Sequence, residues 1–558
     1  MRLPAPPPPA RRASSSSGRP AHYVIAACVA YGIAPVRVEA QTAPAQPPAA
    51  EAAPPQSGNP LSSGPVLGQV PDSGQQADAP PRRNWFVQPR INIGETFTDN
   101  VNPASGFKQA DQITEITPGI RAQADTARLK AYADYQLTGY YYARGSYGSR
   151  TQNALNAFGT FEALEKRFYL DFSGNISQQS ISAFGPQVAS NAILDTNRTE
   201  VSTYRLSPYL RGRIGSEADY ELRYANTWSS SRSSLVSRYT MGEWSAKIKN
   251  SIAKAKLGWS LDLNRQDIDY SAGSKSISER LRGLVSYQFW PEIKASMSAG
   301  QESNDYLTAG RQTQSTSGYG LDWSPTERTL VSAFREKRFF GQGHNYLISH
   351  RTPLMALRYV DSKDVSFLPN QMTTVGRGTI YDLLYTQLES AVPDPILRAQ
   401  QVNSVLAATG VSPSSQVTTG LMTSRVTVST RQDFSVVFNG LRNTITASAT
   451  RNVQSILGAA VGTGDFSLTS SIVQKGLSIT WAHRLTPLAS LTTVASVQET
   501  RSSDGTVGGS RAKSLSINYS TPISAHTNLS AGIRSSEFTG SAQSYRENAV
   551  LASIFARF

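Results

Sequence analysis

The residues that could support catalysis in this chain are few and widely spaced. A hydrolase needs a nucleophilic serine or cysteine, a histidine that activates it, and a third group that orients the histidine. Ser349 stands next to His350, but neighbouring residues of a strand point to opposite faces. No acidic residue is arranged beside a histidine as a protease would need, so we expect no enzymatic activity and no catalytic residues. Beyond residue 40 the chain has four histidines: His344, His350, His483 and His526.

Metal-binding patterns are also missing from the sequence. The only cysteine is Cys28, the histidines are not paired at ligand spacing, and no acidic loop has the Asp/Asn/Gly rhythm of a calcium site. Glu95 and Asp99 are two pleats apart, so they face the same side of a strand if the strand extends that far. We interpret Asp99 and Asn100 as residues that cap a turn. No metal and no cofactor is expected.

The elements that carry these residues are predicted to be strands. The chain is 39% hydrophobic with a mean hydropathy of −0.33. Outside its N-terminal region no apolar stretch reaches the ~18–20 residues that a spanning helix needs. Its 24 tyrosines, 19 phenylalanines and 41 glycines favour pleated strands joined by tight turns.

Beyond Trp85, apolar and polar residues alternate with a period of two. The predicted strands run roughly 10–14 residues, enough for a tilted strand to cross a bilayer, and aromatic residues recur near their ends. We therefore predict an all-β fold over residues 85–558. It is a large transmembrane antiparallel β-barrel of about 20 strands, within a range of about 16–24. In one predicted strand the apolar face is Leu129, Ala131, Ala133, Tyr135 and Leu137.

The first 84 residues are expected to lie outside the barrel. Arginines precede an apolar stretch from Tyr23 to Val36, and the residues up to Ala40 fit a signal-peptidase site. We predict a signal peptide over residues 1–40, cleaved between Ala40 and Gln41. A lipoprotein signal ending at Cys28 is the alternative. Residues 41–84, rich in Pro and Ala, form a leader that we expect to be disordered.

One segment departs from the period of two. Apolar residues between about 380 and 410 recur at helical spacing, and Asp394-Pro395 is a good helix start. We predict a short two-helix insertion there, within a loop region at 360–420. It must enter the lumen as a plug or lie outside as a cap, because irregular backbone cannot face lipid. The insertion could act as a gate or a docking hairpin, or it could only fill a wide lumen, and the sequence does not favour either interpretation. The candidate plug residues are Leu388, Pro395, Arg398 and Val402.

The start of the predicted barrel carries a motif. Residues 91–101 read Ile-Asn-Ile-Gly-Glu-Thr-Phe-Thr-Asp-Asn-Val, and residues 116–121 read Ile-Thr-Pro-Gly-Ile-Arg. With the helical insertion and Phe558, this resembles the PEP-CTERM (exosortase) system-associated outer-membrane β-barrel family over about residues 85–558. The resemblance implies a bacterium that makes exopolysaccharide and sorts proteins through the exosortase pathway, and it supplies no catalytic residues. The motif residues are Glu95, Thr96, Phe97, Thr98, Asp99 and Asn100.

The last predicted strand alternates through Ile554 and Ala556 to Phe558. This ending resembles the terminal signature of bacterial outer-membrane barrels, which implies recognition by the barrel-assembly machinery. We expect the protein in the bacterial outer membrane, with membrane lipid and lipopolysaccharide around it.

The net charge is +14, of which residues 1–40 contribute +4, leaving +10 on the rest. The basic residues stand singly, which argues against nucleic acid. They suit either solvated loops or attraction of anionic polysaccharide and lipopolysaccharide phosphates. The candidate lumen charges are Lys130, Asp134, Asp171, Arg211, Arg213, Glu221 and Arg223.

Two functions fit these observations. The first is a pore or export component for envelope polymer or small solutes, linked to exopolysaccharide and PEP-CTERM systems, with anionic exopolysaccharide or export-system proteins as partners. The alternative is a non-conducting structural or docking barrel that binds a periplasmic or surface partner. A channel for an anionic polymer should line its lumen with cations such as Arg144 and Arg223, whereas a plugged scaffold should pair such cations with acids.

Overall fold

The computed structural model describes part of the chain. The predicted signal peptide with its cleavage site at Ala40 and Gln41, and the predicted leader up to residue 83, lie outside the described residues. The described residues are 84–558 except 104–106, 146, 251–255, 272–274, 307–309, 367–384, 386–397, 400–401, 403–425, 458–463, 468, 504, 506–507 and 542.

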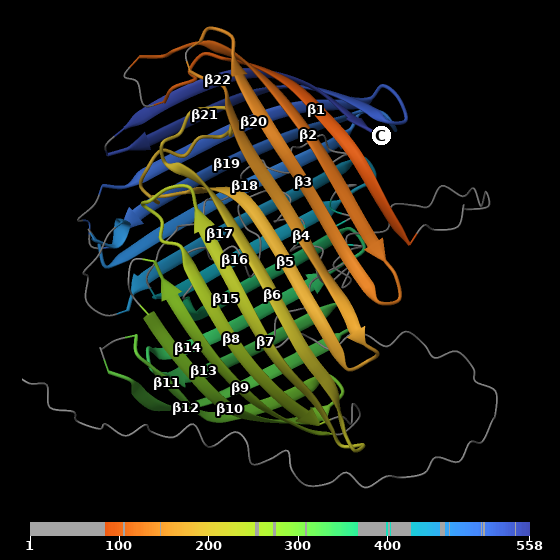
Figure 1. The fold of residues 1–558 in the computed structure, drawn as a ribbon, viewed down its shortest axis with the longest axis vertical. Coiled ribbons are helices and arrows are strands. Elements are labelled where there is room, and N and C mark those ends of the chain that lie inside the picture. Colours follow the sequence, from red (N-terminus) through yellow and green to blue (C-terminus); the bar gives the residue numbers. More distant parts are fainter. Residues whose placement is uncertain are drawn as a thin grey trace, which may run out of the picture. The chain divides into compact units, whose positions relative to one another are not determined.

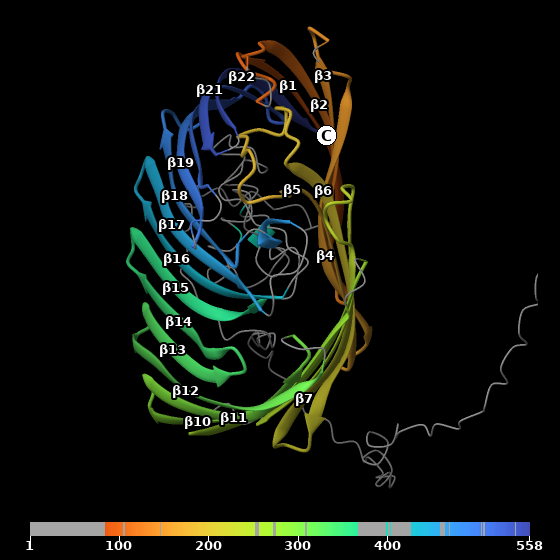
Figure 2. The same cartoon turned by 90° about the vertical axis from the view of Figure 1, so that its left-hand side faces the viewer.

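The described chain forms one 22-stranded antiparallel sheet, in which each strand pairs with the next along the sequence. β1 also pairs with β22, from Arg90 opposite Arg557 to Thr98 opposite Ala549, so the sheet closes into a barrel (Figures 1 and 2). The predicted antiparallel barrel is confirmed, with a strand number inside the predicted range.

The strands are β1 (Trp85–Thr98), β2 (Asp111–Asp125), β3 (Leu129–Tyr142), β4 (Arg150–Leu164), β5 (Phe168–Ser180), β6 (Arg198–Ile214), β7 (Ala218–Ser231), β8 (Tyr239–Asn250), β9 (Leu257–Tyr270), β10 (Lys275–Trp290), β11 (Ile293–Asn304), β12 (Gln312–Thr326), β13 (Thr329–Arg338), β14 (Gly341–Arg351), β15 (Met355–Ser366), β16 (Thr427–Asn439), β17 (Asn443–Ile456), β18 (Ser471–Arg484), β19 (Ser490–Ser502), β20 (Ser510–Pro522), β21 (Thr527–Gly540) and β22 (Ser544–Arg557).

Side chains along each strand point alternately into the lumen and outward. On β9 the exposed residues Leu257, Trp259, Leu261 and Leu263 share the outward face, while Asp262 and Asn264 share the inward one. The same division holds around the ring, so the outer wall is apolar and the inner wall polar, as lipid on one side and water on the other require. The protein is therefore a bacterial outer-membrane β-barrel.

The two ends of the barrel differ in their connections. At the end where β2 turns into β3, strands are joined by links of two to six residues. The other end carries the longer links, among them residues 99–110, 181–197 and 367–426. Short turns face the periplasm and long loops face the outside in barrels of this kind. We assign the two ends accordingly.

The predicted two-helix insertion is not seen. Of residues 367–425 the structure describes Tyr385, Arg398, Ala399 and Val402, which have helical conformation, and the rest of the segment, including Leu388 and Pro395, lies outside the described residues. A short 3-10 turn, η2 (Asp465–Ser467), lies in the link between β17 and β18. In the described part of the chain, no helix combines the length and the hydrophobicity needed to span a bilayer.

Candidate functional site

The lumen wall of β1–β3 carries a charge cluster around Asp134. The carboxylate of Asp134 accepts hydrogen bonds from Arg90 on β1 and from Arg121 Nε on β2, the latter at 3.1 Å. The Tyr132 hydroxyl donates to it at 3.2 Å. Bonds between charged partners are stronger than neutral ones, so this cluster ties three strands together and leaves Asp134 no unpaired charge to offer the lumen.

A second cluster lies on β5–β7 around Arg223. Its guanidinium contacts Asp171 at 2.7 Å and Glu221 at 3.0 Å, and it lies 3.9 Å from the centre of the Tyr209 ring. The neighbouring Arg211 donates to the Tyr169 hydroxyl at 2.6 Å. These bonds fix the arginines flat against the wall, where stacking on aromatic faces adds to the ion pairing.

The structure places all the candidate lumen charges on inward-facing positions of their strands. Arg213 contacts Asp219 at 3.2 Å, and Lys130 lies near the periplasmic end of β3. Arg144 is different, because it belongs to the link between β3 and β4. It is exposed, and its guanidinium donates to the Ala110 carbonyl at 3.1 Å. Arg211 and Arg144 bond to neutral oxygens, whereas the other arginines named on this wall are paired with acids, an arrangement that disfavours a lumen built to attract anions.

A third cluster on β11–β15 involves residues that the sequence analysis did not single out. Arg338 makes two bonds to Glu302, at 3.0 and 2.5 Å, and a third to Asp364. The side chains of Arg338 and Glu302 are only 7% and 2% exposed. The sequence indicates only that both residues face the lumen, because both occupy polar positions in strands where polar and apolar residues alternate.

The opposite sector of the wall is nearly free of charge. The inward positions of β17, β19 and β20 carry no charged side chain, and β18 carries one, Arg484, at its periplasmic end. Serine, threonine, asparagine and glutamine take their place. One row of serines runs in register across six neighbouring strands, and consists of Ser435, Ser448, Ser478, Ser496, Ser514 and Ser536.

The link between β5 and β6, residues 181–197, folds into the ring of strands (Figure 2), and we name it the constriction loop. The Tyr142 hydroxyl donates to the Ala192 carbonyl at 3.0 Å, and the Tyr545 hydroxyl donates to the Gln187 carbonyl at 2.6 Å. The loop is packed into an apolar cluster with inward residues from both ends of the sequence: Val101, Ile113, Tyr140, Tyr142, Val188, Ala192, Ile193, Phe538 and Tyr545.

The start of the constriction loop is held by the link between β17 and β18. The Asp465 carboxylate accepts hydrogen bonds from Ser182 Oγ at 2.7 Å and from the Ala183 amide at 2.6 Å. Loss of hydration on burial raises the pKa of Asp465 above its usual value, although these two bonds act in the opposite direction. Ala183 is buried against Phe466 and Ile472. The loop thus joins separate sectors of the ring and narrows its extracellular mouth.

The described residues of the insertion contact the inner wall. Tyr385 lies 6.2 Å from Phe158 between ring centres, and Ala399 is fully buried in one cluster with Tyr132. Arg398 is stacked over Tyr385 at 4.9 Å. Tyr132 is three residues from the periplasmic start of β3, whereas β15 delivers the insertion at the extracellular end. These contacts therefore lie deep in the lumen, as a plug requires.

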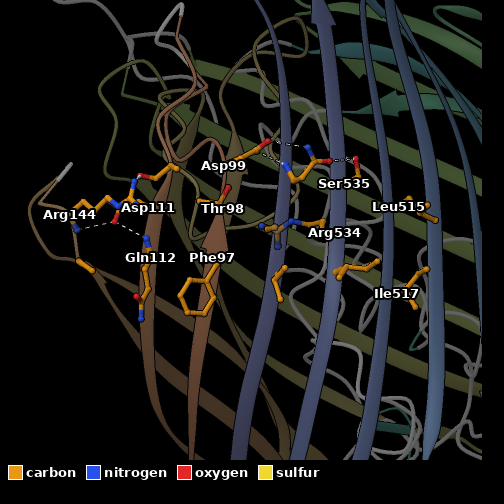
Figure 3. A pocket seen from close by; sticks show the side chains of 16 residues that line it. Phe97, Thr98, Asp99, Asp111, Gln112, Arg144, Leu515, Ile517, Arg534 and Ser535 are labelled. Atoms are coloured by element: carbon orange, nitrogen blue, oxygen red, sulfur yellow. Dashed lines mark hydrogen bonds between the residues drawn. The ribbon is translucent and has the colours of Figure 1, made fainter.

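The motif at residues 95–100 fastens the seam between the first and last strands (Figure 3). The Asp99 carboxylate accepts bonds from the Asn548 amide at 2.7 Å and its side chain at 3.1 Å. Thr98 Oγ1 donates to Glu547 at 3.2 Å, and Asn100 Nδ2 donates to the Arg546 carbonyl at 3.1 Å. The role of Asp99 as a turn cap stays a prediction, and Lys108 of the same link also donates to its carboxylate, at 2.5 Å. Asp99 continues the β1–β22 ladder with side-chain bonds.

The remaining motif residues alternate in the same way. Glu95 faces outward and accepts bonds from Thr114 Oγ1 at 2.7 Å and Gln112 Nε2 at 3.1 Å. Thr96 faces inward, and Phe97 faces outward and is 51% exposed.

The C-terminal signature residues lie on the outer wall beside β1. Ile554 is 48% exposed and is opposite Ile93, and Ala556 is opposite Ile91. Phe558 is 76% exposed, and its amide donates to the Pro89 carbonyl at 2.9 Å. Recognition of these residues by the assembly machinery stays a prediction.

The histidines of the strands lie on the outer wall in separate places. His344 contacts Asp361 at 2.9 Å, His350 contacts Thr329 at 2.8 Å, and Ser349 points to the opposite face from His350. Among the described residues, no group of three or more His, Cys, Asp or Glu side chains is placed to hold a metal ion.

No protein-family model and no curated protein sequence matches this chain. Solved structures with a similar fold include the siderophore receptor PirA from Pseudomonas aeruginosa, with 7% identity and a TM-score of 0.37, covering 85% of this chain and 80% of that one. The FrpB iron transporter from Neisseria meningitidis has 10% identity and a TM-score of 0.36, covering 85% and 82%. Values this low do not indicate a shared ligand.

Proposed function

We propose that this barrel is a gated conduit for a hydroxyl-rich polymer, a component of the exopolysaccharide and PEP-CTERM envelope systems that its motif suggests. The observation that carries the proposal is the uncharged wall of β17–β20, with its serine row. Hydroxyl groups both donate and accept hydrogen bonds, so such a wall can exchange partners with successive sugar hydroxyls without holding any of them strongly.

The wall across the lumen carries stacked aromatic rings. Figure 2 shows β17–β19 on one side of the ring and β4–β6 on the other. On the latter side the inward rings of Tyr169 and Tyr209 are stacked with centres 5.1 Å apart, and Tyr132 and Phe158 are stacked at 5.3 Å. Tyr132, Tyr169 and Tyr209 are buried under the insertion and the neighbouring arginines, so a sugar ring could pack on them only after those groups move. Because Arg223 is paired with Asp171 and Glu221, and Arg211 is bonded to the Tyr169 hydroxyl, the proposal is for a neutral polymer rather than one selected by negative charge.

The gate in this proposal has two parts, the constriction loop at the mouth and, deeper in the lumen, the residues of the insertion that contact the inner wall, such as Tyr385 and Ala399. The same contacts favour the alternative, a non-conducting docking barrel, because buried residues such as Ala399 fill space that a permanently open pore would leave to water. The two functions differ in whether the insertion can move out of the lumen, as a conduit requires, or stays there, as in a docking barrel.

Single-channel recording in planar bilayers separates the two functions. We expect small or rare openings from the full-length barrel and larger ones from a variant that lacks residues 380–410. Silence from both variants, with heat-modifiable gel migration showing folded barrels, would favour the docking function.

The substrate class is tested on the open variant. A neutral glucose oligomer should block its current, and Ser496→Leu with Ser514→Leu should weaken the block. Thr493→Leu on the outward face of β19 is the matched control and should not. Equal block of the open variant, of the variant with both serines replaced and of the Thr493→Leu control would contradict a role for the serine row in binding the polymer.

A further inference from the structure

The outer wall at the extracellular ends of β20–β22, β1 and β2 is hollowed into a groove of about 720 Å³ (Figure 3). This volume lies in the range of small-molecule sites. Most of its lining side chains, such as Phe97, Ser535 and Val550, face away from the lumen, so the groove is separate from the conduit and its contents would lie in the outer leaflet.

The outward side chains of the groove and its upper edge form three rows, which change from apolar to charged towards the extracellular end. The lowest row is apolar, and its residues are opposite one another in the ladder: Ile517, Ile533, Val550 and Phe97. The next row places Leu515 beside polar groups, where Ser535 donates to Asn548 at 2.8 Å and Asn548 donates to Asp99. The third row, nearest the extracellular end, places Glu537 between Lys513 and Arg546.

The charge at the upper edge is positive. Lys513 contacts Glu537 at 3.7 Å. The exposed Arg144, Arg511 and Arg546 have no carboxylate partner among the described residues. Unpaired arginines at this level suit phosphate groups, to which the guanidinium forms two parallel bonds.

From this gradient we propose that the groove binds a phosphorylated glycolipid of the outer leaflet, the class to which lipopolysaccharide belongs. Its acyl chains lie on Phe97, Ile533 and Val550, its sugar and amide groups meet Ser535 and Asn548, and its phosphates meet Arg511 and Arg546. The order of apolar, polar and cationic rows matches the order of groups in such a lipid along the membrane normal.

The test measures binding of a bis-phosphorylated acyl-glucosamine lipid to the full mature protein in detergent, by native mass spectrometry. Ser535→Trp fills the groove from its outer side. Ser317→Trp is the control, because Ser317 also faces outward on β12, five residues from the extracellular end of its strand as Ser535 is on β21. We expect S535W to weaken binding about tenfold or more, since each methylene withdrawn from apolar contact weakens it roughly fourfold, and S317W to leave it unchanged.

The phosphate contacts are tested with the same lipid after removal of its phosphates. The unchanged barrel should prefer the phosphorylated lipid, and Arg511→Gln with Arg546→Gln should abolish that preference. Equal binding by S535W and S317W would overturn the proposal. So would conversion of a dimer to a monomer by S535W with lipid binding unaltered, because the groove would then be a contact between two copies of the chain.

Discussion

The bridge between Asp465 and the constriction loop makes a quantitative prediction about opening of the extracellular mouth. Asp465→Ala removes the acceptor for Ser182 Oγ and for the Ala183 amide. Two such bonds contribute about 2–3 kcal/mol together, once the cost of burying the acceptor is set against them. The fraction of molecules with the start of the loop released should rise by a factor of about 30–160.

Accessibility of a cysteine measures that fraction directly. The only native cysteine is Cys28, within the predicted signal peptide, so Ala183→Cys gives a single reactive site. Ala183 is 2% exposed, and a polar maleimide should reach it only after local opening. We expect the labelling rate of A183C to rise in the D465A background by the factor given above.

Asp305 provides a matched control. Its carboxylate accepts from Ser276 Oγ at 2.7 Å and from the Ile277 amide at 3.0 Å, the same pattern between neighbouring strands instead of across the mouth. Asp305→Ala should leave the labelling rate of A183C unchanged. An equal rise in D305A and D465A, or a rise below about threefold in D465A, would refute the bridge as the tie that holds the loop.

The bridge also sets the sign of a pH effect. Because burial raises the pKa of Asp465, the bridged state binds a proton more readily than the released state. The bridge is then strongest below the ordinary pKa of aspartate and weakens as the pH rises through the raised value. Lowering the pH should slow A183C labelling relative to A183C with Asp465→Asn, whose amide still accepts a bond but does not titrate. A constant ratio would contradict this account.

Two further predictions concern stability. Asp99→Ala should lower the free energy of unfolding in urea by about 1–2 kcal/mol through loss of the seam bonds, and Asn548→Ala should add little to it. Loss of hydration raises the pKa of Asp99, but the bonds from Lys108 and Asn548 outweigh this effect and lower it. The contribution of Asp99 to the stability of the seam is therefore present above the ordinary pKa of aspartate and is lost as the pH falls through the lowered pKa. Arg338→Ala should cost about 3–5 kcal/mol, since Glu302 is left buried and unpaired, whereas replacing both by leucine should restore most of the loss.

The period of two was enough to place individual side chains on the correct face. Alternation within each single strand places Lys130, Asp134, Asp171 and the arginines of β6 and β7 on the lumen side, without any knowledge of how the strands pair. The partners of these charges depend on register, which no single strand contains. Arg90 and Arg121 meet Asp134 only because β1, β2 and β3 are aligned as they are.

Long-range ties were beyond the reach of local patterns. Asp99 and Asn548 are 449 residues apart, and Ser182 and Asp465 are 283 apart. The inward fold of the constriction loop leaves no local signal, because its few apolar residues, such as Val188 and Ile193, show no periodicity. Their burial depends on side chains that other strands supply.

The seam and the constriction depend on one another in a definite order. The seat of the constriction loop is made of inward residues from β2 and β3 at one end of the chain and from β21 and β22 at the other, such as Tyr142 and Tyr545. That seat does not exist until β1 meets β22. Glu547, which accepts a bond from Thr98 at the seam, is two residues from Tyr545, which holds the Gln187 carbonyl. Because contacts between distant segments tend to form late, we expect the loop to fold inward after the barrel has closed. The motif at residues 95–100 thus acts on the mouth of the lumen through the strand that it fastens.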